Sequence, residues 1–414
     1  MLPCFLGELF MKKYCDILII GGGASGLCCA IAAKRNNPGK IVAVLERNDR
    51  VGKKLLATGN GRCNLSNLNV SKERYAGSFK NRSEQVFSSI GVRELLDFFG
   101  SLGLKTTADS EGRLYPLSNQ AASVVDALRF GCEREGVETI CKADIKSVKK
   151  SGKLFKISAG DNEYTSGKLV IACGSKASPK LGGTAGSADY LRNFGHSVKK
   201  FSPALCPVKV DSPVIKSLKG VRIKCGASLI KKDRLIKKEL GEVQFSDKAL
   251  SGICVFNLSL YSSRDCFIKL DLMPELGKSE IIEALRYNRR LYAEKPLDCF
   301  GTGLFQKRIN MALVKLSGIS DFSRSCKSLS DGELKLIADN IKEMTFKASE
   351  NAGFDQAQTA LGGVEGCEID PASMRSLICD DLYVCGEAID ICGECGGFNL
   401  HFAFASGIIA GESL

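Results

Sequence analysis

Apolar and polar residues alternate with two different periods along the chain, and these periods place the main elements. Four short apolar runs have the composition of buried parallel strands: residues 16–20, 40–46, 168–173 and 381–385. Helical spacing follows the first run at residues 27–35 and the last run at residues 399–410. The strand–helix order at both ends of the chain predicts an α/β fold with a Rossmann-like parallel sheet.

The middle of the chain has a different pattern. Residues 201–267 contain proline breaks and alternating β-rich runs, which predict an antiparallel barrel-like or mixed-sheet insert. Three later segments show helical periodicity and predict a small helical cap: residues 278–290, 305–315 and 331–344. We therefore divide the chain into three parts: a discontinuous α/β domain of residues 1–195 and 348–414, a β-rich insert of residues 196–277, and a helical subdomain of residues 278–347.

The first strand runs directly into a glycine-rich turn, Gly21-Gly22-Gly23-Ala24-Ser25-Gly26. This is the dinucleotide-binding fingerprint. In it, Gly21 permits the tight turn, Gly23 lets the pyrophosphate approach the backbone, and Gly26 lets the helix pack close to the strand. Glu46 ends the next strand, where a carboxylate can bind both hydroxyls of an adenosine ribose. The fingerprint serves NAD and FAD alike, and Arg47 would also suit NADP.

A second glycine-rich segment, VGKKLLATGNGRCNLSN at residues 51–67, follows the second strand. Its density of Gly, Asn and basic residues favours a loop that wraps a long cofactor over an ordinary surface loop. The candidate contacts in it are Lys54, Leu55, Thr58, Gly59, Gly61, Arg62, Cys63 and Asn64.

These motifs, together with LYVCGEAIDICGECGGFNLHFAFASG at residues 382–407, resemble the HI0933-like flavoproteins, which include BaiN-type and aminoacetone-oxidase members. The resemblance covers nearly the whole chain. It implies an FAD-dependent oxidoreductase of the two-dinucleotide-binding-domain type. It further implies that backbone near Ile145 passes the adenine, and that the loop Ala172-Cys173-Gly174 lines the cofactor.

The carboxy-terminal motif supplies the other half of the expected FAD site. A strand ends at Gly386-Glu387, where such enzymes contact the ribityl or pyrophosphate part of the flavin, and Asp390 could share that role. The final helix opens with Gly396, Gly397, Phe398, Asn399 and Leu400. Its first N–H groups can face the electron-rich edge of the flavin.

Candidate catalytic groups are few. His401 could donate a proton near the flavin or be a packed core histidine, and Cys392 and Cys395 could form a redox dithiol or simply fill a tight turn. With His196 as the only other histidine, we expect no metal site and no Ser-His-Asp arrangement.

Composition narrows the setting. The formal net charge of +12 permits contact with polyanions, but the basic residues are scattered, with denser patches at 146–153 and 231–238, so nucleic acid is not the expected partner. The chain has 19 Cys and neither a secretion signal nor an apolar run long enough to span a membrane, which predicts a cytoplasmic protein. Residues 1–10 read as an extension before a start at Met11.

The sequence therefore predicts an FAD enzyme that transfers hydride between a small organic substrate and the flavin. One form is a reductase of CH–CH bonds, such as those of unsaturated 3-oxo steroids or bile acids, with transient NADH or NADPH as donor. The alternatives are an amine-type oxidase using dioxygen and an RNA-modifying flavoprotein. We expect the substrate to bind between the cofactor domain and the insert. Neither substrate nor oligomeric state follows from the sequence.

Overall fold

The computed structural model describes residues 12–414 and divides the chain into two units. One unit combines the residues up to Pro203 with Gln358–Leu414, and the other is Ala204–Ala357. The expected extension before Met11 lies outside the described residues.

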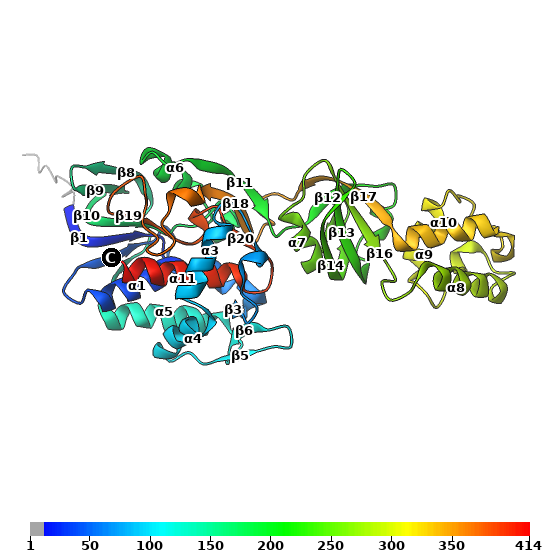
Figure 1. The fold of residues 1–414 in the computed structure, drawn as a ribbon, viewed down its shortest axis with the longest axis horizontal. Coiled ribbons are helices and arrows are strands. Elements are labelled where there is room, and N and C mark those ends of the chain that lie inside the picture. Colours follow the sequence, from blue (N-terminus) through cyan, green and yellow to red (C-terminus); the bar gives the residue numbers. More distant parts are fainter. Residues whose placement is uncertain (1–11) are drawn as a thin grey trace, which may run out of the picture. The chain divides into compact units, whose positions relative to one another are not determined.

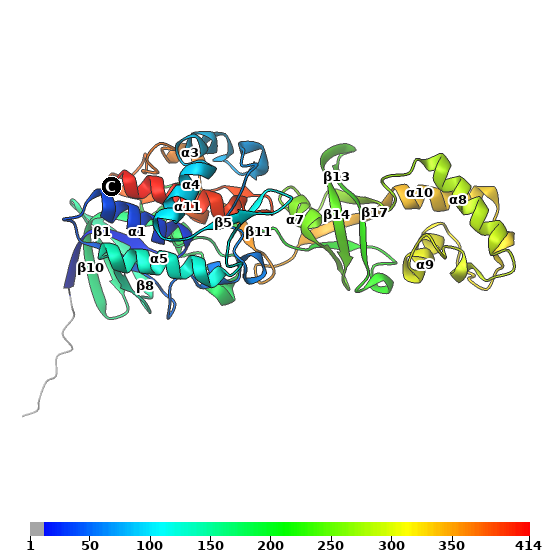
Figure 2. The same ribbon diagram turned by 90° about the horizontal axis from the view of Figure 1, so that it is seen from below.

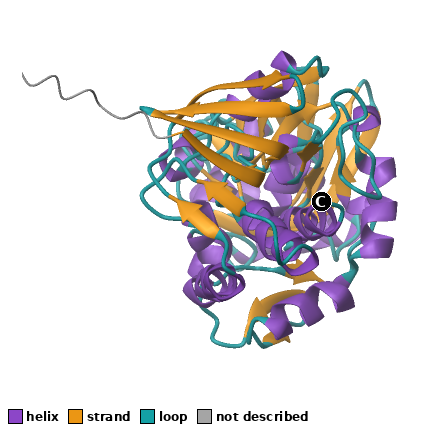
Figure 3. Ribbon diagram, turned by 90° about the vertical axis from the view of Figure 1, so that its left-hand side faces the viewer, coloured by secondary structure: helices purple, strands orange, loops and turns teal. Residues whose placement is uncertain are grey.

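A mostly parallel sheet forms the base of the first unit, with strand order β7-β2-β1-β10-β9-β8 and with β19 beside β10. Its parallel strands are β1 (Lys12–Ile20), β2 (Val42–Leu45), β7 (Glu138–Ile140), β10 (Asn162–Ile171) and β19 (Leu382–Val384). The antiparallel strands β8 (Ile145–Ser151) and β9 (Leu154–Ala159) extend it at one edge. This confirms the predicted α/β, Rossmann-type fold, seen in Figure 3 as strands packed against helices.

Three long helices pack together beside the sheet: α1 (Ala24–Asn36), α5 (Ala121–Glu135) and α11 (Phe398–Glu412), as Figures 1 and 2 show. Residues 25–33 of α1 are all buried, because the sheet, α5 and α11 surround this helix. The smaller elements of this unit are α2 (Lys53–Leu56), β3 (Ser66–Asn67), β4 (Tyr75–Ala76), α3 (Ser83–Ser89), α4 (Val92–Ser101), β5 (Thr106–Ala108), β6 (Arg113–Pro116), α6 (Gly186–Asn193), β11 (Val198–Ala204), β18 (Thr359–Val364) and β20 (Cys392–Gly393).

Helices α1 and α11 touch through their backbones. A Cβ atom placed on Gly407 would lie 2.2 Å from the carbonyl oxygen of Ser25, and one on Gly411 would lie 2.4 Å from that of Cys29. Real Cβ atoms do not approach backbone so closely, and neither helix backbone can move aside alone. The two ends of the chain are therefore locked together by the absence of side chains at one helix crossing.

We expect Gly407→Ala to destabilise the protein by about 2 kcal/mol or more, because the added methyl group overpacks a backbone contact. Urea denaturation of the purified protein measures this. Gly100→Ala is the matched control: Gly100 lies in α4 with no atom within 4 Å of an added Cβ. That change should stabilise the protein by about 0.5–1 kcal/mol, as Gly→Ala does in open helix positions. Equal effects at the two glycines would contradict the role given to Gly407.

The second unit is a closed antiparallel barrel with strand order β12-β15-β14-β13-β16-β17. Its strands are β12 (Val208–Asp211), β13 (Arg222–Lys231), β14 (Arg234–Phe245), β15 (Ala249–Ser251), β16 (Cys266–Asp271) and β17 (Met344–Asn351). Alternate residues of β16 and β17, such as Ile268 and Phe346, are buried inside it. Of the two predicted forms of the insert, the structure has the barrel.

Helices accompany the barrel: α7 (Ile253–Ser259), α8 (Lys278–Leu291), α9 (Lys307–Leu316) and α10 (Asp331–Lys342). The last three lie together at one end of the barrel (Figure 1) and confirm the predicted helical segments. The strand β17 follows them and pairs with β12 and β16, so the chain returns to the barrel at Met344. The sequence had given residues 331–344 to a helix and residues from 348 to the cofactor domain. The division into three parts stays a prediction.

Within residues 12–414, no helix has both the length and the apolar character that crossing a bilayer requires.

Candidate functional site

Four parallel strands of the first unit end at one edge of the sheet, and the loops that follow them carry most of the predicted cofactor residues. Strand β1 leads to Gly21, β2 to Glu46, β10 to Ala172 and β19 to Gly386. Backbone hydrogen bonds tie the loops together: Gly21 N–H donates to Leu45 O at 2.8 Å, and Ala172 N–H donates to Ile20 O at 2.9 Å. Ligands of open α/β sheets bind at this carboxyl edge.

The three fingerprint glycines differ in what surrounds them. Gly21 has φ +112°, and a Cβ on it would lie 2.6 Å from Ala172 O. A Cβ on Gly26 would lie 1.9 Å from Gly21 O, so α1 can approach the strand only with glycine there. Gly23 is half-buried, yet an added Cβ would meet no atom within 4 Å. The open space beside Gly23, at the start of α1, fits the pyrophosphate of a dinucleotide.

We expect Gly23→Val to weaken FAD binding at least tenfold, because its side chain would occupy the space of the pyrophosphate. The melting temperature of the apoprotein should change by only about 2 °C, since the new side chain meets no protein atom. Fluorescence titration of apoprotein with FAD and thermal unfolding give the two readouts. The Gly26→Val variant is the contrast and should lose the fold itself. Wild-type FAD affinity in Gly23→Val would contradict the assignment.

Glu46 is buried and held in place by backbone. Its Oε2 accepts from Gly22 N–H at 2.8 Å, and its Oε1 accepts from Asn48 N–H at 2.8 Å and from the Asn48 side chain at 2.6 Å. Its backbone carbonyl accepts from Ala143 N–H, two residues before Ile145. The stretch expected near the adenine is thus fastened to the residue expected at the ribose. The exposed Arg47 donates to Gly182 O instead.

The second glycine-rich segment turns sharply beside these loops. Gly59, Asn60, Gly61 and Cys63 all have positive φ, and Cys63 is completely buried, which raises the pKa of its thiol to about 12. Cys63 N–H donates to Thr58 O at 3.0 Å, which closes the turn. Arg62 lies over the Tyr115 ring, 4.7 Å from its centroid.

An ion pair joins this segment to the carboxy-terminal motif. Lys54 Nζ lies 2.8 Å from Glu387 Oε2, and the Ser175 hydroxyl donates to the same oxygen at 2.8 Å. Lys54 follows β2, Ser175 follows β10 and Glu387 follows β19, so three loops meet at one carboxylate. Both charged side chains keep part of their surface open, which leaves them able to bind a cofactor.

The loop before α11 is fixed by the GRCNLSN segment. A Cβ on Gly397 would lie 2.3 Å from Ser66 O, and the Asn67 side chain donates to Gly396 O at 2.9 Å. The Asn399 side chain makes two hydrogen bonds to the backbone of Gly393: its Oδ1 accepts from the Gly393 N–H at 2.8 Å, and its Nδ2 donates to the Gly393 carbonyl at 2.7 Å. Asn64 Oδ1 is buried and has no hydrogen-bond partner within residues 12–414, as expected of an atom that meets a ligand donor.

Asp390 has a different surrounding from Glu387. It is buried and accepts from the N–H groups of Ser78 and Gly362 and from Lys199 Nζ at 2.9–3.0 Å. Burial raises its pKa, but the hydrogen bonds from Ser78 and Lys199 outweigh it, and the net pKa is lowered. These contacts join separate loops, and a contact between Asp390 and the cofactor stays a prediction.

His401 lies in the first turn of α11, fully buried beside the Phe87 ring, with Nδ1 2.8 Å from Ser66 Oγ. Burial lowers its pKa to about 4, against a smaller opposite effect of the Ile90 backbone, so the ring is uncharged at neutral pH. This surrounding favours the packed-histidine interpretation. A role for His401 in proton transfer stays a hypothesis.

The burial of His401 makes stability depend on pH. In the unfolded chain its pKa is about 6.5, so between pH 6.5 and 4 the unfolded chain binds a proton that the folded chain does not, and acid favours unfolding. We expect His401 to contribute about 2 kcal/mol of the stability lost between pH 7 and pH 5. His401→Gln should remove that part of the loss in urea denaturation at both pH values. The same loss in variant and wild type would contradict the assignment.

Cys392 and Cys395 are not joined by a disulfide bond in the structure. Cys392 is completely buried, and burial raises its pKa well above the usual value, so its thiol is a poor nucleophile. Its backbone pairs with Ala76 in the two-stranded sheet of β20 and β4. The redox-dithiol hypothesis therefore gains no support from these surroundings and stays untested.

A Ser-His-Glu alignment exists that the sequence did not lead us to expect. Ser376 Oγ lies 2.8 Å from His196 Nε2, and His196 Nδ1 lies 2.7 Å from Glu368 Oε2. However, Ser376 Oγ also accepts from the N–H groups of Ile378 and Cys379, and the side chain is buried. It cannot act as a nucleophile there, and the three residues tie distant loops together. Sequence analysis did not find this alignment, because His196 lies about 170–180 residues from Glu368 and Ser376.

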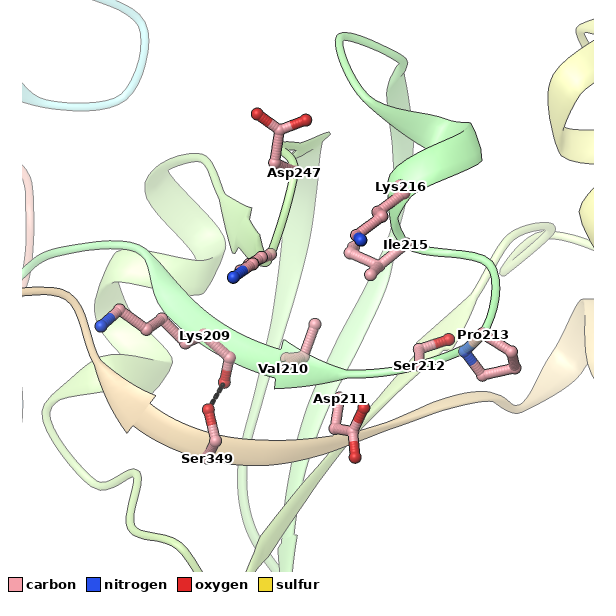
Figure 4. A pocket seen from close by; sticks show the side chains of 10 residues that line it. Lys209, Val210, Asp211, Ser212, Pro213, Ile215, Lys216, Asp247 and Ser349 are labelled. Carbon is pink, nitrogen blue, oxygen red and sulfur yellow. Dashed lines mark hydrogen bonds between the residues drawn. The ribbon is translucent and has the colours of Figure 1, made fainter.

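A hollow of about 430 Å³ lies on the barrel of the second unit (Figure 4). Lys209, Asp211, Lys216 and Lys248 are among its lining residues, and Ser349 donates to Lys209 O at 3.2 Å. None of the predicted cofactor residues lines it. Within residues 12–414, no three His, Cys, Asp or Glu side chains gather as metal ligands would.

Comparison with known proteins places this geometry in a family. The family model described as the HI0933-like protein Rossmann domain matches residues 15–413. A 3-dehydro-bile acid delta(4,6)-reductase of Clostridium scindens is 35% identical over 404 residues, which cover 95% of this chain and 98% of that protein. A ribosomal RNA dihydrouridine synthase of Escherichia coli is 25% identical over 409 residues, 98% of each chain.

Solved structures share the fold at low identity. The 3-ketosteroid delta1-dehydrogenase of Sterolibacterium denitrificans, solved with 1,4-androstadiene-3,17-dione, aligns with a TM-score of 0.50 at 10% identity, over 96% of this chain and 99% of that one. The quinol fumarate reductase of Escherichia coli also has a TM-score of 0.50, at 12% identity over 97% and 70% of the two chains. The chain thus belongs to the HI0933-like family and is an FAD-dependent oxidoreductase.

Proposed function

We propose that this enzyme reduces a carbon–carbon double bond conjugated to a carbonyl group in a small organic molecule, with NADH or NADPH as the external electron donor. The observation that carries the proposal is full-length identity of 35% to a 3-dehydro-bile acid delta(4,6)-reductase. The name of that relative describes double bonds conjugated to a ring ketone. Dihydrouridine, named in two further relatives, is likewise uridine whose base is saturated beside a carbonyl group.

When bound, FAD would supply hydride transfer from the donor to the double bond, and a proton from solvent would complete the saturation. The residues of the chain would hold and polarise the FAD. The open backbone at Gly23 and the start of α1 suit its pyrophosphate, and Glu46 suits the adenosine ribose. The pair Lys54–Glu387 and the N-terminal N–H groups of α11 suit the ribityl chain and the electron-rich edge of the ring system. The buried, uncharged His401 adds no positive charge there.

An RNA-modifying enzyme is the second candidate. Two ribosomal RNA dihydrouridine synthases align with this chain over nearly their whole length, at 25% and 23% identity. The small-molecule assignment ranks first because the identity to the bile-acid reductase is higher. The amine-oxidase alternative stays a hypothesis. The cytoplasm stays the proposed compartment, supported by the lack of disulfide bonds among the cysteines of residues 12–414.

The test is an anaerobic reduction of the FAD-loaded enzyme by NADH or NADPH, followed by addition of a steroid 4-en-3-one. We expect the flavin absorbance to be bleached by the nicotinamide and restored by the enone, with a product two hydrogens heavier by mass spectrometry. The Gly23→Val variant should be inactive with the same additions. Restoration by unmodified ribosomal RNA and by no conjugated enone would favour the second candidate and contradict the first.

A further inference from the structure

The tip of the β13–β14 hairpin carries apolar side chains that the barrel does not bury. A two-residue turn, Lys232-Asp233, joins the strands with positive φ at both positions. Beside it, Leu235 is 59% exposed and Ile236 43% exposed, and Phe267 on the neighbouring strand β16 is 41% exposed. Large apolar side chains that gather on a surface mark an interaction site more often than isolated ones do.

The strand register places these side chains in one row. Leu235 of β14 pairs with Ile230 of β13, Ile230 pairs with Phe267 of β16, and Phe267 pairs with Lys347 of β17. Directly paired residues of antiparallel strands share a face of the sheet. Leu235, Ile230 and Phe267 therefore form a continuous apolar strip on the outside of the barrel, ending at a lysine.

Positive charge surrounds this strip. Residues 231–238 contain five basic residues and one acidic residue. Five cations of this region make no ion pair within residues 12–414: Lys231, Lys232, Arg234, Lys238 and Lys347. The remaining basic residue of this run, Lys237, pairs with Glu239, and farther along the strands Lys269 pairs with Glu343. The ammonium and guanidinium groups of those five cations are therefore available to bind an anionic partner.

We propose that this surface, the β13–β14 tip, docks on an anionic phospholipid membrane. Leucine, isoleucine and phenylalanine side chains gain free energy at the boundary of head groups and acyl chains, while the lysine and arginine side chains reach the phosphates. RNA fits less well, because single-stranded RNA is bound by aromatic platforms and polar groups, and three of the four apolar side chains here are aliphatic. The inference concerns where the enzyme works and does not depend on the substrate.

Flotation of the FAD-loaded full-length enzyme with vesicles tests the proposal. We expect co-flotation with vesicles of phosphatidylglycerol and phosphatidylcholine, and at least tenfold less binding to pure phosphatidylcholine. An apolar variant, Leu235→Ser with Ile236→Ser, and a charge variant, Lys231→Gln with Lys232→Gln and Arg234→Gln, should each bind at least tenfold more weakly.

The matched control replaces two exposed apolar residues elsewhere in the same unit, Tyr287→Ser in α8 and Leu336→Ser in α10, which are 58% and 50% exposed. It should bind vesicles like the wild type. FAD content and circular dichroism verify that each variant is folded, and the charge variant alters only side chains at an exposed turn. Failure of the wild type to float with anionic vesicles overturns the proposal, as does equal flotation of all variants.

A filter-binding assay with a ribosomal RNA fragment separates the other partner class. Salt-dependent RNA binding that the charge variant loses and the apolar variant keeps, without vesicle binding, would make the β13–β14 tip an RNA surface and overturn the membrane proposal.

Discussion

The contact between the backbones of α1 and α11 is the constraint on which the cofactor site depends. With glycine at 407 and 411, the two helices lie closer than any side chain would allow. Strand β19, which precedes α11 in the chain, pairs with β10, and this adds the loop at Gly386 to those at Gly21 and Ala172. The interaction between α1 and α11 is mainly dispersion between well-packed atoms. Its many small contributions add up to a strong contact, which a single added methyl group would disturb.

Ion pairs of three carboxylates also hold distant segments of this unit together. Glu387 pairs with Lys54, Asp390 with Lys199 and Glu394 with Arg74, and each pair joins segments that are far apart in the sequence. Glu394 and Asp390 are nearly inaccessible to water, where a lone charge would be costly, so their cationic and backbone partners are part of the fold. Glu387 and Lys54 keep some exposure, so their side chains stay accessible, and their contact with the cofactor stays a prediction.

Much of this could be predicted from local patterns. The spacing of Gly21, Gly23 and Gly26 identified the fingerprint, because all three glycines lie within six consecutive residues and the motif can be recognised locally. Alternation along residues 201–267 indicated a barrel-like or mixed-sheet insert, of which the structure has the barrel. Strand β17 was missed although Met344–Asn351 alternates between buried and exposed residues, because it directly follows a helix and its partners β12 and β16 come much earlier in the sequence. The contacts of Asp390 and the alignment of Ser376, His196 and Glu368 depend on tertiary distances that no local pattern records.

The division of the cofactor unit by Ala204–Ala357 also sets an order of events during synthesis. All six strands of the barrel have left the ribosome well before α11 is made, so this inserted unit can fold while the surrounding one is still unfinished. Until the last residues emerge, the sheet of β1, β2 and β10 and the helix α1 beside it lack the cover that α11 provides. A nascent chain of this enzyme can therefore carry a finished barrel while the residues of its nucleotide fold are still being added.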